Sequence, residues 1–433
     1  MKPSPVERVL VVILLIIFGG IAIHAPLTVW LGTIWPAYDQ VIKAWKELLM
    51  AVALALLIIV ALRRNMVGTF LRDRLLQLSL AYAGLHFVMI AVFQNGLLAA
   101  GAGLLIDLRF VLYFVLVYCT IRLLPQYRKA FVTVFASGVA VVIGFALLQM
   151  FVLPHDVLTY IGYSKDTIAP YLTVDQNPMY IRINSTLRGP NPLGAYVVII
   201  LSMALAAAIS IGRRMKPDQR WTVGIVAAAS GLVLGVTYSR SSLIGLLVAI
   251  GVTIGAVATK KIRQQLMVIV AIGVIGIASF LIIARADPVV SNIVWHDNPV
   301  GGSAVDSNAG HAESLIDGVK RLVQQPLGEG VGSTGSASLD GKQPLIIENQ
   351  YLFVAHEVGW LGLVIFGWLF VEIMRRLWLR RHGALALGVF ASGCGLAVIG
   401  LLLPVWVDDT VSIIWWGLAA VAVGGAYNAR KNH

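Results

Sequence analysis

The chain has 433 residues, of which 58% are hydrophobic and 12% are charged, and its mean hydropathy is +0.85. This composition excludes a soluble globular domain and is typical of a polytopic membrane protein. The apolar runs are about 20 residues long, which is the length of a helix that crosses a hydrocarbon core about 30 Å thick. We therefore predict an all-α helical bundle in a membrane.

Apolar runs of this length recur about twelve times along the chain and predict about twelve transmembrane helices. They lie near 9–25, 47–62, 75–94, 104–123, 130–153, 193–212, 221–238, 241–259, 265–284, 351–374, 384–404 and 409–427. The first run lacks the small-residue cleavage pattern of a signal peptide, so we expect it to be retained as a span. We treat residues 1–433 as a single integral membrane domain.

Arginine and lysine cluster in the loops that follow every second span. Examples are Arg63 and Arg64, Arg213 and Arg214, and Arg375 and Arg376. Because basic loops remain in the cytoplasm, we expect these loops and both chain termini on that side. This placement accounts for most of the formal net charge of +12, so we expect no nucleic-acid partner.

The longest segment that lipid cannot accommodate is an outer loop at 285–350, between the ninth and tenth spans, rich in Gly, Ser, Asp and Asn. Leu315, Val319 and Leu322 recur in it at helical spacing and predict a short helix on the outer face. His311 opens this helix, where it can cap the helix, bond within the loop or touch a substrate. The glycine run at 328–332 follows a helix rather than a strand, which argues against a phosphate loop.

A second outer loop, at 154–192, ends in a Gly-Pro-Asn-Pro turn that leads into a span. We expect Asn191 to cap this helix and Pro192 to occupy its first position. Arg182 and Arg188 lie just before this outward-facing helix N-terminus. Guanidinium groups beside free backbone N–H groups suit a phosphate or diphosphate, although lipid headgroups are an alternative ligand.

Other charged residues lie near or inside the predicted spans. Arg240 occupies a short polar break, Thr-Tyr-Ser-Arg-Ser-Ser, between two apolar runs. An arginine deep in a bilayer costs about 2.5–3.5 kcal/mol on insertion scales, so Arg240 needs an anionic partner or a wet cavity. We expect Asp107 and Arg109 to be neutralised within the bundle. The basic residues expected to snorkel to the interface are Lys43, Lys46, Arg285 and Lys342.

The large loop closes at Glu348 and Asn349, at the outer mouth of the tenth span, with His356 and Glu357 one to two turns deeper. A carboxylate held between apolar neighbours binds a proton more readily, which suits general-base work. Glu348 can instead form a salt bridge with an arginine, and the two roles are compatible. The two cysteines lie in apolar runs, and the outer loops hold no cluster with metal-ligand spacing, so we expect no metal site.

Three motifs resemble the O-antigen ligase and polymerase family. They are Arg182 to Ala195, in the form R-x-x-S-T-x-x-x-P-N-x-L-G-A, the stretch Thr237-Tyr-Ser-Arg-Ser, and Glu348-Asn349-x9-Gly359-x2-Gly362. The Pro-Leu-Gly-x-Gly-x-Gly run at 326–332 is similar to the family too. Members of this family are integral membrane glycosyltransferases that use polyprenyl-diphosphate-linked glycans.

The resemblance implies transfer of a glycan from undecaprenyl diphosphate on the periplasmic face of the inner membrane, with inversion and without metal or cofactor. Glu348 would take the acceptor proton, oriented by Asn349. The implied substrate-binding residues are Arg182, Arg188, Asn191, Arg240 and Tyr351. Partners implied are lipid-linked glycans, membrane lipids, and a chain-length regulator or flippase.

The sequence departs from the ligases of this family, which carry a histidine where this chain has Glu348. The Glu-Asn-x-Tyr form is similar to polysaccharide polymerases, so we favour a polymerase over a ligase that acts on lipid A core. His311 or His356 remains an alternative base. The rivals from other classes are a transporter or flippase for lipid-linked sugars, which should show an internal repeat and mid-bilayer charges, and a structural scaffold.

Overall fold

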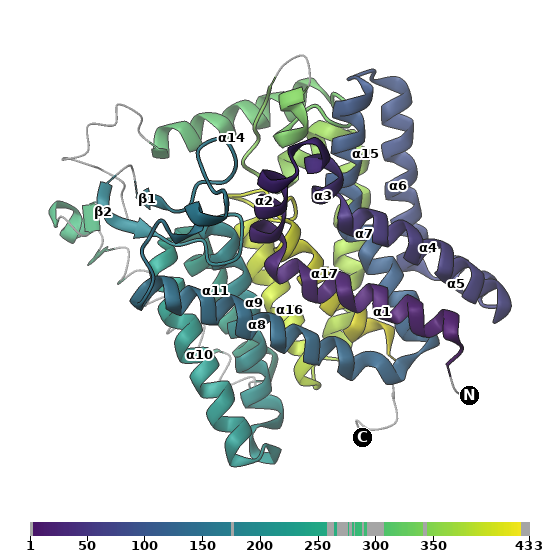
Figure 1. Ribbon diagram of the computed structural model, residues 1–433, viewed down its shortest axis with the longest axis horizontal. Coiled ribbons are helices and arrows are strands. Elements are labelled where there is room, and N and C mark those ends of the chain that lie inside the picture. Colours follow the sequence, from purple (N-terminus) through teal and green to yellow (C-terminus); the bar gives the residue numbers. More distant parts are fainter. Residues whose placement is uncertain are drawn as a thin grey trace.

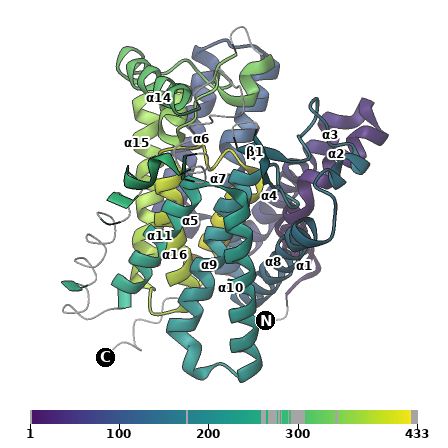
Figure 2. The ribbon, with the colours of Figure 1, turned by 90° about the vertical axis from the view of Figure 1, so that its left-hand side faces the viewer.

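The computed structural model describes residues 3–174, 177–257, 307–340 and 344–425, together with parts of 264–291. The protein is a bundle of helices (Figures 1 and 2). The first helix, α1 (Pro5–Gly20), begins on one side of the bundle, and α14 (Ser307–Gln324), the helix expected in the large loop, lies on the opposite side (Figure 1). We call the side of α14 the outer side, as the charge pattern predicts.

In the described part of the chain, nine helical segments are long and apolar enough to cross a membrane. Pro5–Ile34 comprises α1, η1 (Ile21–Ile23) and α2 (His24–Ile34), and Pro125–Phe151 comprises η3 (Pro125–Tyr127) and α8 (Arg128–Phe151). The others are α4 (Trp45–Arg63), α6 (Arg74–Val92), α7 (Leu97–Leu123), α9 (Pro190–Ile211) with η5 (Gly212–Arg214), α10 (Pro217–Thr237), α11 (Arg240–Val257) and α15 (Gln350–Leu379). Two shorter apolar helices are α16 (Ala384–Ile399) and α17 (Asp409–Gly424).

The all-α class is confirmed, but the predicted count of twelve spans is not. Eleven of the predicted runs coincide with the segments above, and the run near 265–284 lies mostly outside the described residues. Depending on how the two short helices are counted, the described chain holds nine to eleven apolar helices.

The connections between the long helices contain several short helices. They are η2 (Pro36–Tyr38), α3 (Asp39–Lys43), α5 (Val67–Leu71), η4 (Val157–Ile161), η6 (Ala284–Ala286) and η8 (Gly335–Asp340). The outer loop at 154–192 also holds a small antiparallel sheet of β1 (Leu172–Val174) and β2 (Asn177–Arg182), in which Leu172 pairs with Arg182. This hairpin was not predicted from the sequence, because a three-residue strand is too short to show an alternating pattern.

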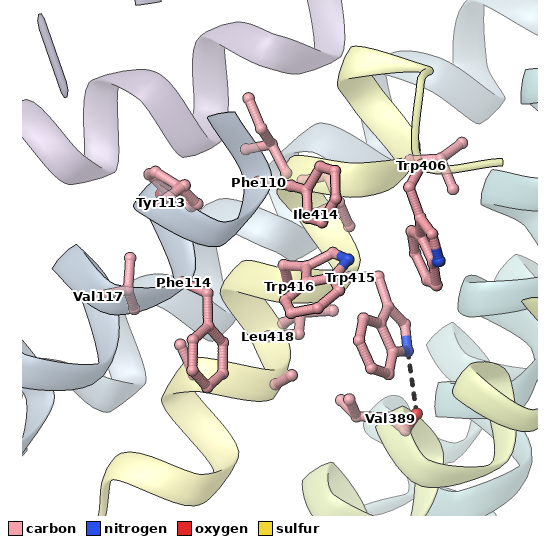
Figure 3. Packing of buried hydrophobic residues seen from close by; sticks show 14 of the residues in the cluster. Phe110, Tyr113, Phe114, Val117, Val389, Trp406, Ile414, Trp415, Trp416 and Leu418 are labelled. Carbon is pink, nitrogen blue, oxygen red and sulfur yellow. Dashed lines mark hydrogen bonds between the residues drawn. The ribbon is translucent and has the colours of Figure 1, made fainter. Parts of the chain in front are cut away.

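Helix α17 is the centre of the packed core, and every residue from Asp409 to Gly424 is buried. A helix that is apolar on all sides is expected to be enclosed by other helices. Figure 3 shows Trp415 and Trp416 packed against Trp406 and against Phe110 of α7. The ring centroids of Trp406 and Trp415 lie 5.1 Å apart, and those of Phe110 and Trp416 lie 4.9 Å apart. These aromatic contacts hold the outer end of α17 in one position.

Helices α9, α11 and α16 pack closely together because glycines line their contacts. A Cβ atom on Gly395 of α16 would lie 2.5 Å from the carbonyl oxygen of Gly245 in α11. A Cβ atom on Gly194 of α9 would lie 2.5 Å from the hydroxyl of Ser242 in α11. Small residues allow such close backbone approach between transmembrane helices. The N-terminal ends of α9 and α11, which carry Asn191 and Arg240, are therefore held side by side.

Candidate active site on the outer side

Helix α15 is broken between its first two turns and the rest of its length. Val358 has non-helical angles and Gly359 has φ +69°, a conformation that L side chains rarely adopt. The break leaves two backbone groups for the preceding loop: the His356 carbonyl accepts from Glu329 N at 2.7 Å, and Trp360 N donates to the Pro326 carbonyl at 2.9 Å. The positive φ at Gly359 thus explains why the first position of the Gly359-x2-Gly362 motif is a glycine.

The glycine run at 328–332 packs directly on backbone atoms of α7 and α15. Gly328, Gly330 and Gly332 all have positive φ. A Cβ atom on Gly328 would lie 2.6 Å from the His356 carbonyl oxygen, and one on Gly103 of α7 would lie 2.5 Å from Gly332 N. Neither neighbour is a flexible side chain that can move aside. The run serves as a packing surface for the loop, in agreement with the argument against a phosphate loop.

The buried side chain of Glu357, in α15, forms hydrogen bonds with backbone groups at the end of this glycine run. Its carboxylate is 1% exposed and accepts from Gly332 N at 2.6 Å and from Thr334 N at 3.0 Å. The carboxyl of Asp107 lies beside it, and His86 Nε2 lies 3.6 Å from Asp107 Oδ2. Asp107 is therefore neighboured by His86 and Glu357 rather than by Arg109, the residue two positions along the same helix.

Asn349 caps the broken end of α15. Its Oδ1 accepts from Tyr351 N at 2.9 Å and from Leu352 N at 3.0 Å, and its Nδ2 donates to the Leu401 carbonyl at 2.8 Å. The Tyr351 hydroxyl donates to the Ala397 carbonyl at the outer end of α16, at 2.8 Å. Glu348 is half-buried and directly precedes this cap. Both the oxygen and the nitrogen of the Asn349 side-chain amide are hydrogen-bonded, and this cap fixes the backbone next to Glu348.

The second group of predicted site residues meets around Arg182. Its Nε donates to the Thr237 carbonyl at 2.8 Å, and its Nη2 donates to Asn191 Oδ1 at 2.6 Å. Arg182 therefore joins the end of β2, the start of α9 and the turn between α10 and α11. The expectation that Asn191 caps α9 is wrong. The helix starts at Pro190, whose missing N–H suits the first helical position, and the side chain of Asn191 accepts from Arg182 instead.

Arg240 is the first residue of α11 and is half-buried. The turn before it contains Tyr238 in a left-handed conformation, with φ +47°. Ser239 and Ser242 hydroxyls lie 2.9 Å apart across the turn. The polar break predicted from the sequence is thus a tight, internally hydrogen-bonded corner between two spans.

The Ser-Thr pair of the first motif has a role that sequence reasoning missed. Ser185, buried and with φ +50°, donates through its hydroxyl to the Val142 carbonyl at 2.6 Å. The Thr186 hydroxyl donates to the Ala22 carbonyl at 2.6 Å. The two side chains attach the outer loop to α8 and η1. The sequence feature that could have indicated this role is the position of the pair between Arg182 and Arg188 in the motif.

Arg188 is exposed and lies near Asp408 at the N-cap of α17. Asp408 Oδ1 accepts from Val411 N at 2.9 Å. Burial raises the pKa of the Asp408 carboxyl, and so does Asp409, while Arg188 acts to lower it.

A buried cluster of charges surrounds Asp409, the next residue along the chain, and it was not predicted from the sequence. Asp409, 3% exposed, pairs with His24 at 2.9 Å, with Lys46 at 3.0 Å and with Arg109. The expectation that Lys46 snorkels to the interface is wrong, since Lys46 is only 3% exposed. The sequence feature that could have indicated this cluster is the pair Asp408-Asp409 at the start of an otherwise apolar run.

The two candidate histidines lie in different helices. His356 is 5% exposed and lies in the short first segment of α15. His311 lies in α14, but its side chain is outside the described part of the structure, as are Lys342 and the tip of the hairpin. Helix α14 itself lies over the start of α15, where Gly318 faces Leu352.

These features define a polytopic membrane protein with a polar, arginine-bearing outer face under a loop and a short helix. Residues 225–367 match a family model described as O-antigen ligase (Wzy_C), and this stretch includes Arg240, Glu348 and Gly359. The match covers about a third of the chain. No curated protein matches the chain.

Proposed function

We propose that the protein polymerises oligosaccharide repeat units carried on undecaprenyl diphosphate, at the periplasmic face of the inner membrane. A growing glycan is transferred to a hydroxyl of another lipid-linked repeat unit, and the lipid diphosphate leaves. The single observation that supports the proposal is the pair of hydrogen bonds from Arg182 to Thr237 and Asn191, because it brings residues of two of the three motifs into contact.

The diphosphate half of the site rests on Arg182, Arg188 and Arg240. The N-termini of α9 and α11 begin beside these arginines, and free N–H groups at a helix N-terminus favour negative charge. Preorganised cationic groups stabilise the charge that develops on a leaving diphosphate. The proposed reaction therefore requires no metal ion.

The acceptor half rests on Glu348. In the proposed step, the acceptor hydroxyl gives its proton to Glu348 as its oxygen forms a bond to the anomeric carbon of the donor. The bond from that carbon to the diphosphate oxygen breaks, and its electron pair leaves with the diphosphate. Attack from the face opposite the leaving group inverts the anomeric centre.

Helix α16 provides the structural link between the two halves. Its outer end accepts hydrogen bonds from Tyr351 and, just beyond the helix, from Asn349, and its sides pack on α9 and α11. A base held at the start of α15 and arginines held at the starts of α9 and α11 share this one support. That arrangement favours a single site over two separate ones.

An O-antigen ligase is the second candidate, because the matched family carries that description. The two activities differ in acceptor: the polymerase extends another lipid-linked glycan, whereas the ligase transfers it to lipid A core. Glu348, in the place of the ligase histidine, is the reason for preferring the polymerase.

The test is to incubate purified protein with lipid-linked oligosaccharide and to measure longer lipid-linked products. We expect polymerisation by the wild type, with and without a metal chelator, and none by Glu348→Gln or Arg240→Ala. Glu313→Gln, on the exposed surface of α14, is the matched control and should polymerise normally. Normal chain lengths from either site variant would refute the assigned roles. Products on lipid A core would identify a ligase, and transbilayer movement without new bonds would identify a flippase.

A further inference from the structure

A cavity of about 390 Å³ lies at the other end of α15 from Glu348, where the positive-inside pattern places the cytoplasm. Its walls come from the ends of α7, α15 and α17 and from Asp73, the residue before α6. Three arginines line it: Arg122, Arg376 and Arg380. Cavities of this size are large enough for a small ligand or headgroup.

Asp73 is the carboxylate that holds two of these arginines in place. It accepts from Arg122 Nη1 at 2.7 Å, from Arg376 Nη2 at 3.0 Å and from the Tyr118 hydroxyl at 2.7 Å. Both guanidinium groups are mostly buried, with exposed side-chain fractions of 27% for Arg122 and 20% for Arg376. The arginines are therefore preorganised around the cavity.

Positive charge is in excess at this site. Of the described residues, three arginines and one carboxylate line the cavity. Arg380 has a further interaction of its own, so the imbalance is that of Arg122 and Arg376 against Asp73. Glu372 also accepts a hydrogen bond from Arg376, but it pairs with Arg375 at 2.8 Å as well. Because Glu372 and Arg375 have opposite charges, this pair leaves the excess of positive charge unchanged. Arg128 adds another positive charge, because its guanidinium lies against Gly425, which lines the cavity. A cavity with this imbalance favours an anion.

The donors suit a phosphate group. A guanidinium has five N–H donors, and within the described part of the chain Arg122 donates to Asp73 and Tyr118 from Nη1 alone, so its Nε and Nη2 can donate to a ligand. Arg380 is held at the cavity wall by donating from Nη1 to the Ala422 carbonyl at 2.8 Å. Paired, planar donors of this kind match phosphate oxygens.

We propose that this cavity binds the phosphate headgroup of an anionic phospholipid in the cytoplasmic leaflet. The cavity lies at the ends of membrane-spanning helices, at the depth where headgroups lie, and apolar residues Ile121, Pro125 and Val423 complete its wall. Basic cavities between transmembrane helices on the cytoplasmic side bind such headgroups. A bound lipid would contact the ends of α7, α15 and α17. At their other ends, α15 begins just after Glu348, and α17 begins close to Trp415 and Trp416.

The test measures lipid binding to the full-length protein in detergent, by native mass spectrometry and by thermal unfolding. The probes are phosphatidylglycerol, phosphatidylcholine with the same acyl chains, and inorganic phosphate. We expect the wild type to bind phosphatidylglycerol at least tenfold more tightly than phosphatidylcholine and to gain thermal stability from it. Equal binding of the two lipids would overturn the proposal, and this comparison needs no variant.

The paired variant Arg122→Gln/Arg380→Gln should weaken phosphatidylglycerol binding at least tenfold. Arg72→Gln/Arg381→Gln removes the same charge from the same side, at residues that do not line the cavity, and should bind within twofold of wild type. Equal losses in both variants would show general surface attraction and overturn the site. Stabilisation by inorganic phosphate equal to that by the lipid would assign the cavity to a soluble phosphate and overturn the lipid assignment.

Discussion

The carboxylate of Glu357, inside the bundle, accepts a hydrogen bond from the backbone N–H of Gly332 at 2.6 Å, although the two residues are 25 positions apart. The same carboxylate binds Thr334 N. This contact holds residues 332–334 of the large outer loop on the short first segment of α15, which begins just after Glu348. The position of the proposed base thus depends on a residue buried in the membrane bundle.

Replacing Glu357 by alanine should release the loop. Two buried backbone N–H groups lose their acceptor, and each unsatisfied group costs about 1–3 kcal/mol. We expect lower thermal stability and faster proteolysis within 326–345, with lower transferase activity as a consequence. Glu313→Ala, on the exposed face of α14, is the control. Wild-type proteolysis rates in Glu357→Ala would contradict the role of this contact.

The two glycines at 359 and 367 of α15 should respond oppositely to alanine. Gly359 has φ +69°, and its Cβ atom would lie 2.7 Å from the Pro326 carbonyl oxygen, so Gly359→Ala should cost more than the roughly 1–3 kcal/mol of a strained backbone. No atom lies within 4 Å of a Cβ atom placed on Gly367, where alanine should be neutral or stabilising by up to about 1 kcal/mol. Thermal unfolding in detergent measures both. Similar melting temperatures would show that the break in α15 is not required.

Arg182 and Asn191 should be coupled in activity. Arg182→Lys keeps the charge but cannot donate to Thr237 and Asn191 in the same geometry, and a lost charged hydrogen bond costs about 1.5–3 kcal/mol. We expect a loss of transferase rate of about 10- to 100-fold. Asn191→Ala should add little to Arg182→Lys, because both remove the same bond. Fully additive losses in the double variant would show that the two residues act independently.

Lys43 and Lys46, which the sequence treats alike, should differ in their contribution to stability. Lys46 is 3% exposed and pairs with Asp409, so Lys46→Gln leaves buried charge less compensated and should cost up to about 3–5 kcal/mol. Lys43 pairs with Asp39 on the surface, and Lys43→Gln should cost about 0–1 kcal/mol. Chemical or thermal unfolding of the two variants side by side tests this. A neutral Lys46→Gln would mean that Arg109 and His24 alone satisfy Asp409.

Asp73 should make stability fall in acid. Burial acts to raise its pKa, but hydrogen bonds from Arg376 and Tyr118 outweigh burial and hold the pKa below its ordinary value of 3.8. A carboxyl with a lowered folded-state pKa stabilises the protein above its unfolded-state pKa, and that stabilisation is lost as the pH falls through the folded-state pKa. We expect Asp73→Asn to lose less stability than wild type below pH of about 4. Asp317→Asn, exposed on α14, should follow the wild-type curve.

Much of the fold was predictable because the lipid bilayer imposes one simple requirement. Long apolar runs must be helices whose backbone groups bond internally, so eleven runs were located from composition alone. The exceptions were short. The hairpin of β1 and β2 is too small for periodicity to reveal, and the start of α9 differs from the expected cap by the placement of one proline.

The sequence by itself determined the membrane class, the helices and the three motifs that carry the family resemblance, because hydrophobic length and local residue type need no knowledge of distant contacts. Only the tertiary structure decided which charges meet. Arg109 pairs with Asp409, 300 positions away, while Asp107 lies beside Glu357, and Arg182 joins two turns through Asn191 and Thr237. A buried charge must find an opposite charge or a polar group wherever the packing of helices brings one. Pairing of this kind is a property of the folded bundle.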